Sequence, residues 1–216
     1  MATFEAVLFD LDGTLVDSIP LIFRTYRRVF ADLGLPWDPG AVAAQIGIPL
    51  RVISRKFAGD RAEEFYRLYQ RYYQEEHDRL TRLFPGTKEA LRELKRHGLR
   101  LGIVTSKSAA VTRRTLTFTG LGSFMETVIT VDDVREPKPG AEPVLRGLAA
   151  LGAEPGRALY VGDSCHDMLA GRRAGTAVVG VTWGLARREE LLACGADLVV
   201  DCWSELLAFA LDSRGR

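Results

Sequence analysis

Acidic, hydroxyl and basic side chains recur where short apolar runs of this 216-residue chain end. In chain order, these candidates are Asp10, Asp12, Thr105, Ser106, Lys138, Asp163 and Asp167. Asp10 and Asp12 lie on alternate residues, so their side chains can leave an extended segment in the same direction, and Gly13 permits a sharp turn after them. Because parallel sheets bind ligands at the carboxyl ends of their strands, we expect this set to share one site.

A cluster of this composition requires a cation. A single aspartate after a strand is more often a helix cap or a turn residue than part of a site. Four ionised aspartates beside one lysine, however, leave a charge of about −3 in a small volume, and like charges at that range raise pKa values. Mg²⁺ removes this conflict, since it prefers one or two carboxylates together with waters and phosphate oxygens. The pattern therefore predicts a site for Mg²⁺ and a phosphate group.

The same side chains meet the requirements of phosphoryl transfer. A carboxylate attacks phosphorus and forms an aspartyl-phosphate, which splits one difficult displacement into two easier steps. A second carboxylic acid protonates the leaving oxygen and then acts as a base on the attacking water. Hydroxyls, backbone N–H groups and a lysine hold the phosphoryl oxygens in line. We therefore expect a phosphohydrolase.

The elements that position these residues are short apolar runs separated by helical patterns. The expected strands cover residues 6–10, 99–105, 158–163, 177–183 and 197–201, with a weaker one at 128–131. Continuous apolar runs of this length are typical of strands buried on both faces. The alternation with helices predicts an α/β fold with a three-layer, Rossmann-like parallel sheet.

Residues 17–81 interrupt this alternation and are expected to form an all-helical cap domain. A first helix is capped by Asp17 and Ser18, and its apolar residues recur at spacings of three and four. A second helix is expected from about residue 60 to residue 80, with His77 facing solvent. No strand is evident between them. The predicted catalytic core therefore consists of residues 1–16 and 82–216.

The order of these motifs resembles the haloacid dehalogenase superfamily of phosphohydrolases over essentially the whole chain. The residues that carry the resemblance are Asp10-Leu11-Asp12-Gly13-Thr14, Thr105, Lys138, and Gly162-Asp163-Ser164 with Asp167. The resemblance implies that Asp10 is the nucleophile and that Asp12 is the general acid/base. It also implies that Thr105 and Lys138 bind the transferring phosphoryl group, with help from Ser106.

The resemblance further implies a set of Mg²⁺ ligands. Asp10 and Asp163 would bind the ion through their carboxylates, and Asp12 through its backbone carbonyl. Asp167 would hold the ion directly or through water. In having an aspartate at position 12, the chain resembles the phosphatases and mutases of the superfamily. The dehalogenases and transport ATPases of the superfamily lack this aspartate.

The helical insert looks like the cap of the branch that contains phosphoglycolate phosphatases and β-phosphoglucomutases. Thr14, a candidate substrate-binding residue, resembles the phosphatases of this branch more than the mutases. Residues 117–119 and 131–134, together with the pairs Lys138-Pro139 and His166-Asp167, look most like bacterial inorganic pyrophosphatases. The implied substrate is pyrophosphate or phosphoglycolate.

A turn within the cap carries the remaining substrate-binding candidates. In the branch that the chain resembles, the turn at Gly47 to Arg51 faces the active site and helps to choose the substrate. The fork of the Arg51 guanidinium suits a distal carboxylate or phosphate. We expect Gly47 and Arg51 to contact the substrate.

Composition excludes several other classes of partner. The 29 basic residues nearly balance the 28 acidic ones, which argues against binding nucleic acid or an anionic membrane through a bulk field. The longest uncharged run, residues 174–186, is too short to span a bilayer. Three cysteines without a CxxC pair favour a reduced, cytoplasmic protein, with Cys165 as a small loop residue. We expect a monomer or homodimer.

Two alternative functions use the same residues. A phosphomutase would form the same aspartyl-phosphate but would release an isomerised sugar phosphate in place of free phosphate. A non-catalytic binding protein on this fold would have no physical need for a clustered negative site.

Overall fold

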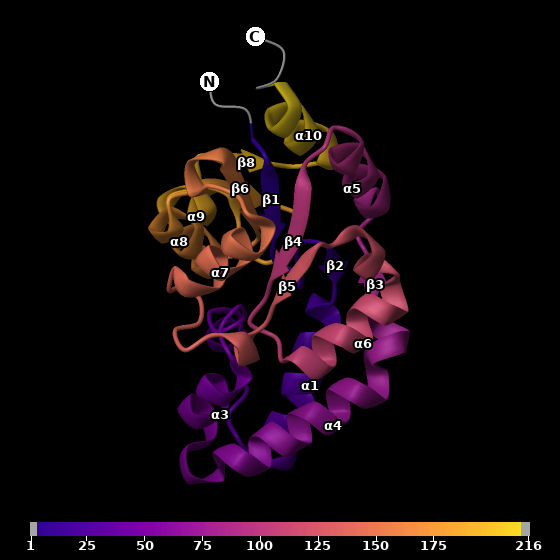
Figure 1. The fold of residues 1–216 in the computed structure, drawn as a ribbon. Helices are drawn as coiled ribbons and strands as arrows, with labels where there is room; N and C mark the ends of the chain where they lie inside the picture. The colour runs from indigo at the N-terminus through magenta and orange to yellow at the C-terminus, as the bar shows by residue number, and fades with distance from the viewer. Residues whose placement is uncertain (1–3, 213–216) are drawn as a thin grey trace.

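The computed structural model describes residues 4–212. Its core is a six-stranded parallel sheet (Figure 1). The strand order is β5 (Thr127–Ile129), β4 (Arg100–Val104), β1 (Ala6–Phe9), β6 (Ala158–Gly162), β7 (Ala177–Val181) and β8 (Leu198–Val200). Five of these strands lie within the ranges that their apolar runs predict, and β5 begins one residue before its predicted range, so the expected parallel α/β sheet is confirmed.

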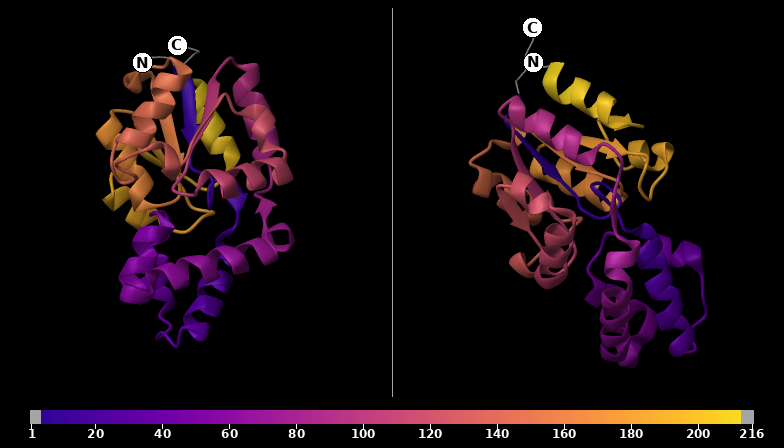
Figure 2. Two further views of the ribbon diagram at one scale, coloured as in Figure 1. Left: turned by 60° about the horizontal axis from the view of Figure 1, so that its bottom comes forward. Right: turned by 90° about the vertical axis from the view of Figure 1, so that its right-hand side faces the viewer.

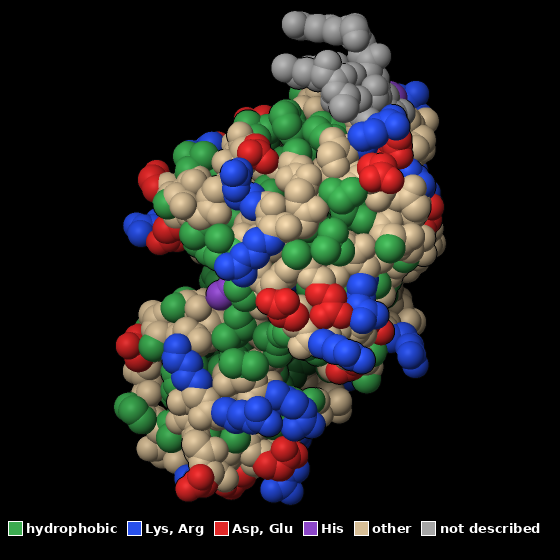
Figure 3. Space-filling view, turned by 60° about the vertical axis from the view of Figure 1, so that its left-hand side comes forward, with side chains coloured by type: hydrophobic (Ala, Val, Ile, Leu, Met, Phe, Trp, Pro, Cys, Tyr) green, Lys and Arg blue, Asp and Glu red, His purple; other side chains and the backbone are tan. Residues whose placement is uncertain are grey.

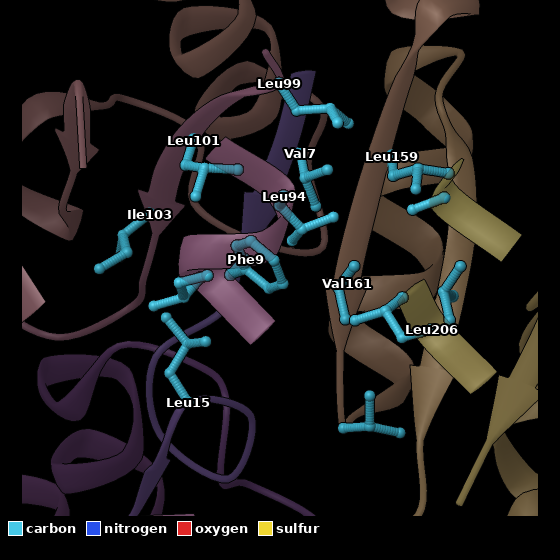
Figure 4. Close-up of a cluster of buried hydrophobic side chains, with 14 of the residues drawn as sticks. Val7, Phe9, Leu15, Leu94, Leu99, Leu101, Ile103, Leu159, Val161 and Leu206 are labelled. Carbon is cyan, nitrogen blue, oxygen red and sulfur yellow. The ribbon is translucent and has the colours of Figure 1, made fainter. Parts of the chain in front are cut away.

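Helices cover both faces of this sheet (Figure 2). One face carries α7 (Glu142–Leu151), α8 (Cys165–Ala174) and α9 (Arg188–Ala193), and the other carries α5 (Thr87–Arg96) and α10 (Trp203–Asp212). Successive residues of β1 point to opposite faces, so that Leu8 packs with α7 and Phe9 packs on the side of α5. Figure 4 shows the cluster around Phe9. The strand is apolar throughout because both of its faces are buried.

The cap is an insertion between β1 and α5, joined to the core by a two-stranded antiparallel ribbon. This ribbon pairs β2 (Val16–Asp17) with β3 (Arg82–Leu83), two strands that the apolar pattern does not reveal. The cap helices are α1 (Ile19–Asp32), α2 (Pro39–Ala43), α3 (Leu50–Ala58) and α4 (Ala62–Leu80). The expected boundaries at residues 17 and 81 lie at this ribbon, whereas residues 1–3 and 213–216 of the expected core lie outside the described residues.

Aromatic packing holds the cap helices together. Phe30 of α1 makes edge contacts with Phe57 and Phe65, at centroid distances of 5.1 and 5.7 Å. Tyr26 and Tyr69 lie 4.6 Å apart between α1 and α4. This cluster is separate from the cluster beneath the sheet, so the cap has its own hydrophobic core.

The expectation that His77 faces solvent is wrong. Its side chain is fully buried where α4 packs against α6 (Ala109–Thr119) of the core. Nε2 lies 2.9 Å from Thr115 Oγ1, and Nδ1 lies 2.6 Å from Asp78 Oδ1. Burial lowers the pKa of His77, and the neighbouring carboxylate opposes this effect. The helical pattern of α4 does not show this contact, because α6 lies in a distant part of the sequence.

The expectations of a fully reduced chain and of Cys165 as a small loop residue are also corrected. Cys165, the first residue of α8, forms a disulfide with Cys194, which directly follows α9. The two residues are 29 positions apart and are brought together because α8 and α9 pack side by side on one face of the sheet. Cys202 is a free, exposed cysteine.

Within residues 4–212, none of the helices combines the length and the hydropathy that crossing a bilayer requires.

Truncation of the cap core should cost stability. Phe65→Ala removes a fully buried ring that contacts Tyr26 and Phe30, and we expect it to lower the free energy of unfolding by about 3–5 kcal/mol. Urea titration followed by circular dichroism measures the loss. Val52→Ala, at a side chain that is 48% exposed, serves as the control and should change stability by less than about 0.5 kcal/mol. Equal midpoints for both variants would contradict a packed cap core.

Candidate active site

The candidate residues meet at the carboxyl edge of the three central strands. β1 lies between β4 and β6, so the segments that follow these strands run side by side. The backbone N–H of Asp10 donates to Val161 O, which extends the β1–β6 ladder to the first aspartate. The backbone N–H of Thr105 donates to Ile129 O, and this hydrogen bond places the Thr105 hydroxyl at the end of β4.

Lys138 joins two of the carboxylates at the centre of the site. Its Nζ lies 2.8 Å from Asp10 Oδ1 and 2.7 Å from Asp167 Oδ1, and all three side chains are at most 7% exposed. Burial alone would lower the pKa of Lys138, but Asp10 and Asp167 together raise it well above its ordinary value. The ammonium is therefore permanently charged and ties the loop of residues 130–140 to the strand ends.

Burial raises the pKa of Asp10 to about 7, although Lys138 opposes the shift. Asp163 is affected in the same direction. Burial raises its pKa well above the ordinary value, and the charges of Asp167 and Asp10 add to the effect. Both shifts favour the protonated carboxyls, because the buried acidic side chains outnumber the one ammonium beside them. A bound cation would reverse these shifts.

Two hydrogen bonds hold the side chain of Asp163. Leu185 N–H donates to its Oδ2 at 2.8 Å, and Thr14 Oγ1 lies 3.4 Å from its Oδ1. The side chain of Thr14 is fully buried, so this hydroxyl faces the aspartate. A role for Thr14 in contacting substrate stays a prediction.

Asp167 has little hydrogen-bonding capacity left. Its Oδ1 accepts from Lys138 and from Tyr160 OH, the latter at 3.0 Å, and its Oδ2 accepts from Ser164 N and Oγ in the capping box of α8. Its carboxylate therefore fixes Lys138 and the start of α8. Contact with a cation through an intervening water fits this arrangement better than direct ligation.

The carboxylates that could hold a cation form a compact group of hard donors. One oxygen each from Asp10, Asp163 and Asp167 lies within 4.8 Å of the others, and all three residues are buried. Oxygen donors with excess negative charge suit a divalent cation such as Mg²⁺ or Mn²⁺ and not a soft metal. The side chains present therefore fit the metal site that the sequence predicts.

Glycines make the space for these carboxylates. A Cβ on Gly184 would lie 2.4 Å from both Asp163 Oδ2 and the carbonyl oxygen of Gly13. Gly13 has φ +82°, and a Cβ there would lie 2.0 Å from Asp163 Oδ2. Gly13 belongs to the first motif, but Gly184 lies in the loop after β7, where sequence reasoning identified no functional residue.

Asp12 faces a second cation that the sequence analysis did not assign. Lys107 Nζ lies 2.6 Å from Asp12 Oδ1 and 2.7 Å from Tyr73 OH, which belongs to cap helix α4. Ser18, directly before α1, also donates to Asp12 Oδ1. The predicted general acid/base is therefore held by one residue of the core and one residue at the edge of the cap.

The cap and the core enclose a cavity of about 310 Å³ above these residues. Asp10, Asp12, Asp163, Thr105 and Ser106 line its floor, and Gly47 and Arg51 line its cap side. Figure 3 shows the indentation between the two lobes, with hydrophobic side chains at the surface there.

The cap turn contacts the core directly. Ser106 Oγ donates to Gly47 O at 2.6 Å, so two predicted substrate-binding residues meet at the seam between cap and core. Arg51 is exposed at the cavity rim, where it pairs with Glu63 at 3.2 Å and stacks on Tyr66. Contact of these residues with a substrate stays a prediction.

Comparison with known proteins places this site in a family. The family model described as "Haloacid dehalogenase-like hydrolase" matches residues 7–181. Pyrophosphatase PpaX of Bacillus velezensis is 38% identical over 207 residues, which cover 94% of each chain. Pyrophosphatase PpaX of Anoxybacillus flavithermus is 36% identical and covers 94% of this chain and 95% of its own.

A solved structure agrees. It is described as a "predicted phosphoglycolate phosphatase" from Haemophilus somnus 129PT and superposes with a TM-score of 0.87 at 30% identity, covering 97% of this chain and 99% of its own. The chain belongs to the haloacid dehalogenase-like hydrolase family. The expectation of a hydrolase of the phosphatase class is confirmed at this level.

Filling the space beside Asp163 should impair the site. Gly184→Ala places a Cβ against that carboxylate and the backbone of Gly13, and we expect kcat/KM for phosphate release to fall at least about 100-fold, with an overpacking cost of about 1–3 kcal/mol. The colorimetric assay of released phosphate measures the activity.

Gly156→Ala is the matched control, because an added Cβ there meets nothing within 4 Å. It should leave both activity and melting temperature unchanged. Full activity in Gly184→Ala would show that the loop after β7 does not hold Asp163 in place.

Proposed function

We propose that this protein is a Mg²⁺-dependent phosphohydrolase that forms an aspartyl-phosphate on Asp10. The observation that supports this most directly is the buried group of Asp10, Asp163 and Asp167 around the ammonium of Lys138. Such a group attracts a divalent cation and a phosphate dianion together, and it places a carboxylate at the floor of a cavity.

Asp10 acts as the nucleophile through the oxygen that Lys138 does not occupy. One carboxylate oxygen accepts from Lys138 at 2.8 Å, which fixes the rotamer and leaves the other oxygen for attack on phosphorus. Lys138 also offsets repulsion between the carboxylate and the phosphoryl oxygens. Thr105, which is 5% exposed at the cavity floor, is in position to donate to one of those oxygens.

Asp163 and Asp10 would hold Mg²⁺ through their carboxylates, with the backbone carbonyl of Asp12 and with Asp167 through water. Mg²⁺ supplies charge neutralisation at the phosphoryl group. Asp12 handles the proton: it donates to the leaving oxygen and then takes a proton from the water that hydrolyses the aspartyl-phosphate. The cap excludes other water during these steps.

The substrate is a small phosphorylated molecule, with pyrophosphate or phosphoglycolate as the candidates. The names of the two PpaX relatives support pyrophosphate, and the structural neighbour from Haemophilus somnus supports phosphoglycolate. Ser106, Gly47 and Arg51 line the same cavity and are the proposed substrate contacts. Thr14 would act on the substrate indirectly, through its hydrogen bond to Asp163. We propose that the enzyme works in the cytoplasm as a monomer or homodimer.

Removal of the nucleophile tests the covalent step. Asp10→Asn keeps the size of the side chain but removes its charge, and turnover should fall by at least about 10⁴-fold. Phosphate release and intact-protein mass after rapid acid quench measure the rate and the phosphoenzyme. Asp60→Asn, on the exposed side of the cap, is the control. Comparable turnover by wild type and Asp10→Asn would refute the assignment, and an isomerised product would indicate a mutase.

Removal of the metal tests the acidic cluster. Dialysis against EDTA should abolish phosphate release, and Mg²⁺ should restore it while Na⁺ at equal ionic strength should not, because only a divalent cation neutralises three buried carboxylates. Activity that is indifferent to both treatments would eliminate the metal from the mechanism.

A further inference from the structure

Lys107 supplies a second buried positive charge, separate from the one that binds the nucleophile. Its side chain is 10% exposed, and it contacts Asp12 of the core and Tyr73 of the cap. The ammonium also lies 5.0 Å from the centre of the Tyr73 ring. The carboxylate of Asp12 offsets the burial of this positive charge.

The two buried lysines face different parts of the site. Lys138 is held between Asp10 and Asp167, beneath the point of nucleophilic attack. Lys107 lines the cavity between cap and core. Arg51 is the other cationic residue among the described residues that line this cavity, but it is 60% exposed and paired with Glu63. Lys107 is therefore the desolvated cation that a ligand in the cavity meets.

The position of Lys107 relative to Asp12 defines which end of a substrate it meets. In the proposed reaction, Asp12 hydrogen bonds to the oxygen of the leaving group. Oδ1 of Asp12 already accepts from Lys107 and Ser18, so the leaving oxygen meets Oδ2 of the same carboxylate, next to the atom that lies 2.6 Å from Lys107 Nζ. The leaving group must therefore pass close to this ammonium.

We propose that Lys107 is a specificity-determining residue that selects substrates whose leaving group carries a negative charge. This inference rests on the proposed function. In the first step, a bond forms between an Asp10 oxygen and phosphorus, and the bond from phosphorus to the leaving oxygen breaks. The electron pair of that bond stays on the leaving oxygen, which takes a proton from Asp12 when it is an alkoxide. A carboxylate or second phosphate on the leaving group pairs with Lys107, which keeps its own proton.

The cap contributes to this selection through Tyr73. Its hydroxyl, on α4, accepts from Lys107 and directs the ammonium into the cavity, and the side chain is 3% exposed. The tyrosine pKa is raised to about 12, chiefly by burial, so the phenol is neutral and does not cancel the lysine charge. An anionic leaving group therefore meets a fixed, water-poor cation, where charge pairing is stronger than at the surface.

Matched substrates separate this role from the positioning of Asp12. Phosphoglycolate and 2-hydroxyethyl phosphate both have alkoxide leaving groups, but only the first carries a distal carboxylate. In Lys107→Met we expect the ratio of kcat/KM for phosphoglycolate to that for 2-hydroxyethyl phosphate to fall at least about tenfold, mainly through KM. Lys107→Arg should restore the ratio to within about threefold of wild type.

An unchanged or increased ratio in Lys107→Met would overturn the proposal, whatever the absolute loss, because equal losses mean that Lys107 acts only through Asp12. Melting temperature checks folding. Should the methionine variant not fold, Tyr73→Phe retains the lysine without its guiding hydroxyl and should lower the ratio by about threefold or more. Failure of the proposed function gives a different result, in which wild-type enzyme with Mg²⁺ releases phosphate neither from these two substrates nor from pyrophosphate.

Discussion

The buried contact of Lys138 with Asp10 and Asp167 is the interaction on which the site depends. It allows two buried carboxylates to lie side by side, and it connects the end of β1, the helix α8 and the loop before α7. Removing one partner from a buried charge group generally costs far more than the group contributes in total. The cluster therefore constrains the ends of β1 and β6 together, and Asp163 occupies the space that remains beside them.

Local patterns predict the strands of the core and the place where the candidate site residues meet. β1 and β6 are apolar on both faces because helices cover both sides of the sheet, so their bounds can be predicted from composition alone. Parallel pairing then brings their carboxyl ends together, which is why Asp10 and Asp163 converge without any information on side-chain contacts. The order of the motifs also predicts that Lys138 belongs to this site. The two prolines that flank Lys138 restrict the loop that carries it.

Contacts between distant segments are what the sequence does not reveal. His77 lies on a polar stretch of α4, yet the core helix α6 covers it. Lys107 acquires its partners only when the end of β4, the first motif and the cap helix meet. Gly184 has no local reason to be glycine, and the space it leaves is used by a residue 21 positions earlier, Asp163. In each case the cause is tertiary packing, which spacing along the chain cannot report.

The antiparallel ribbon of β2 and β3 has a consequence for how such an enzyme diversifies. Because Val16 pairs with Leu83, the chain leaves the core and returns to it at one point, and the whole cap lies between Asp17 and Arg82, which pair with each other across the ribbon. The acidic cluster is on the core side of this junction, and the cap residues that line the cavity are on the other side. A change of the whole insert would therefore alter one wall of the cavity and leave the acidic cluster of the core in place.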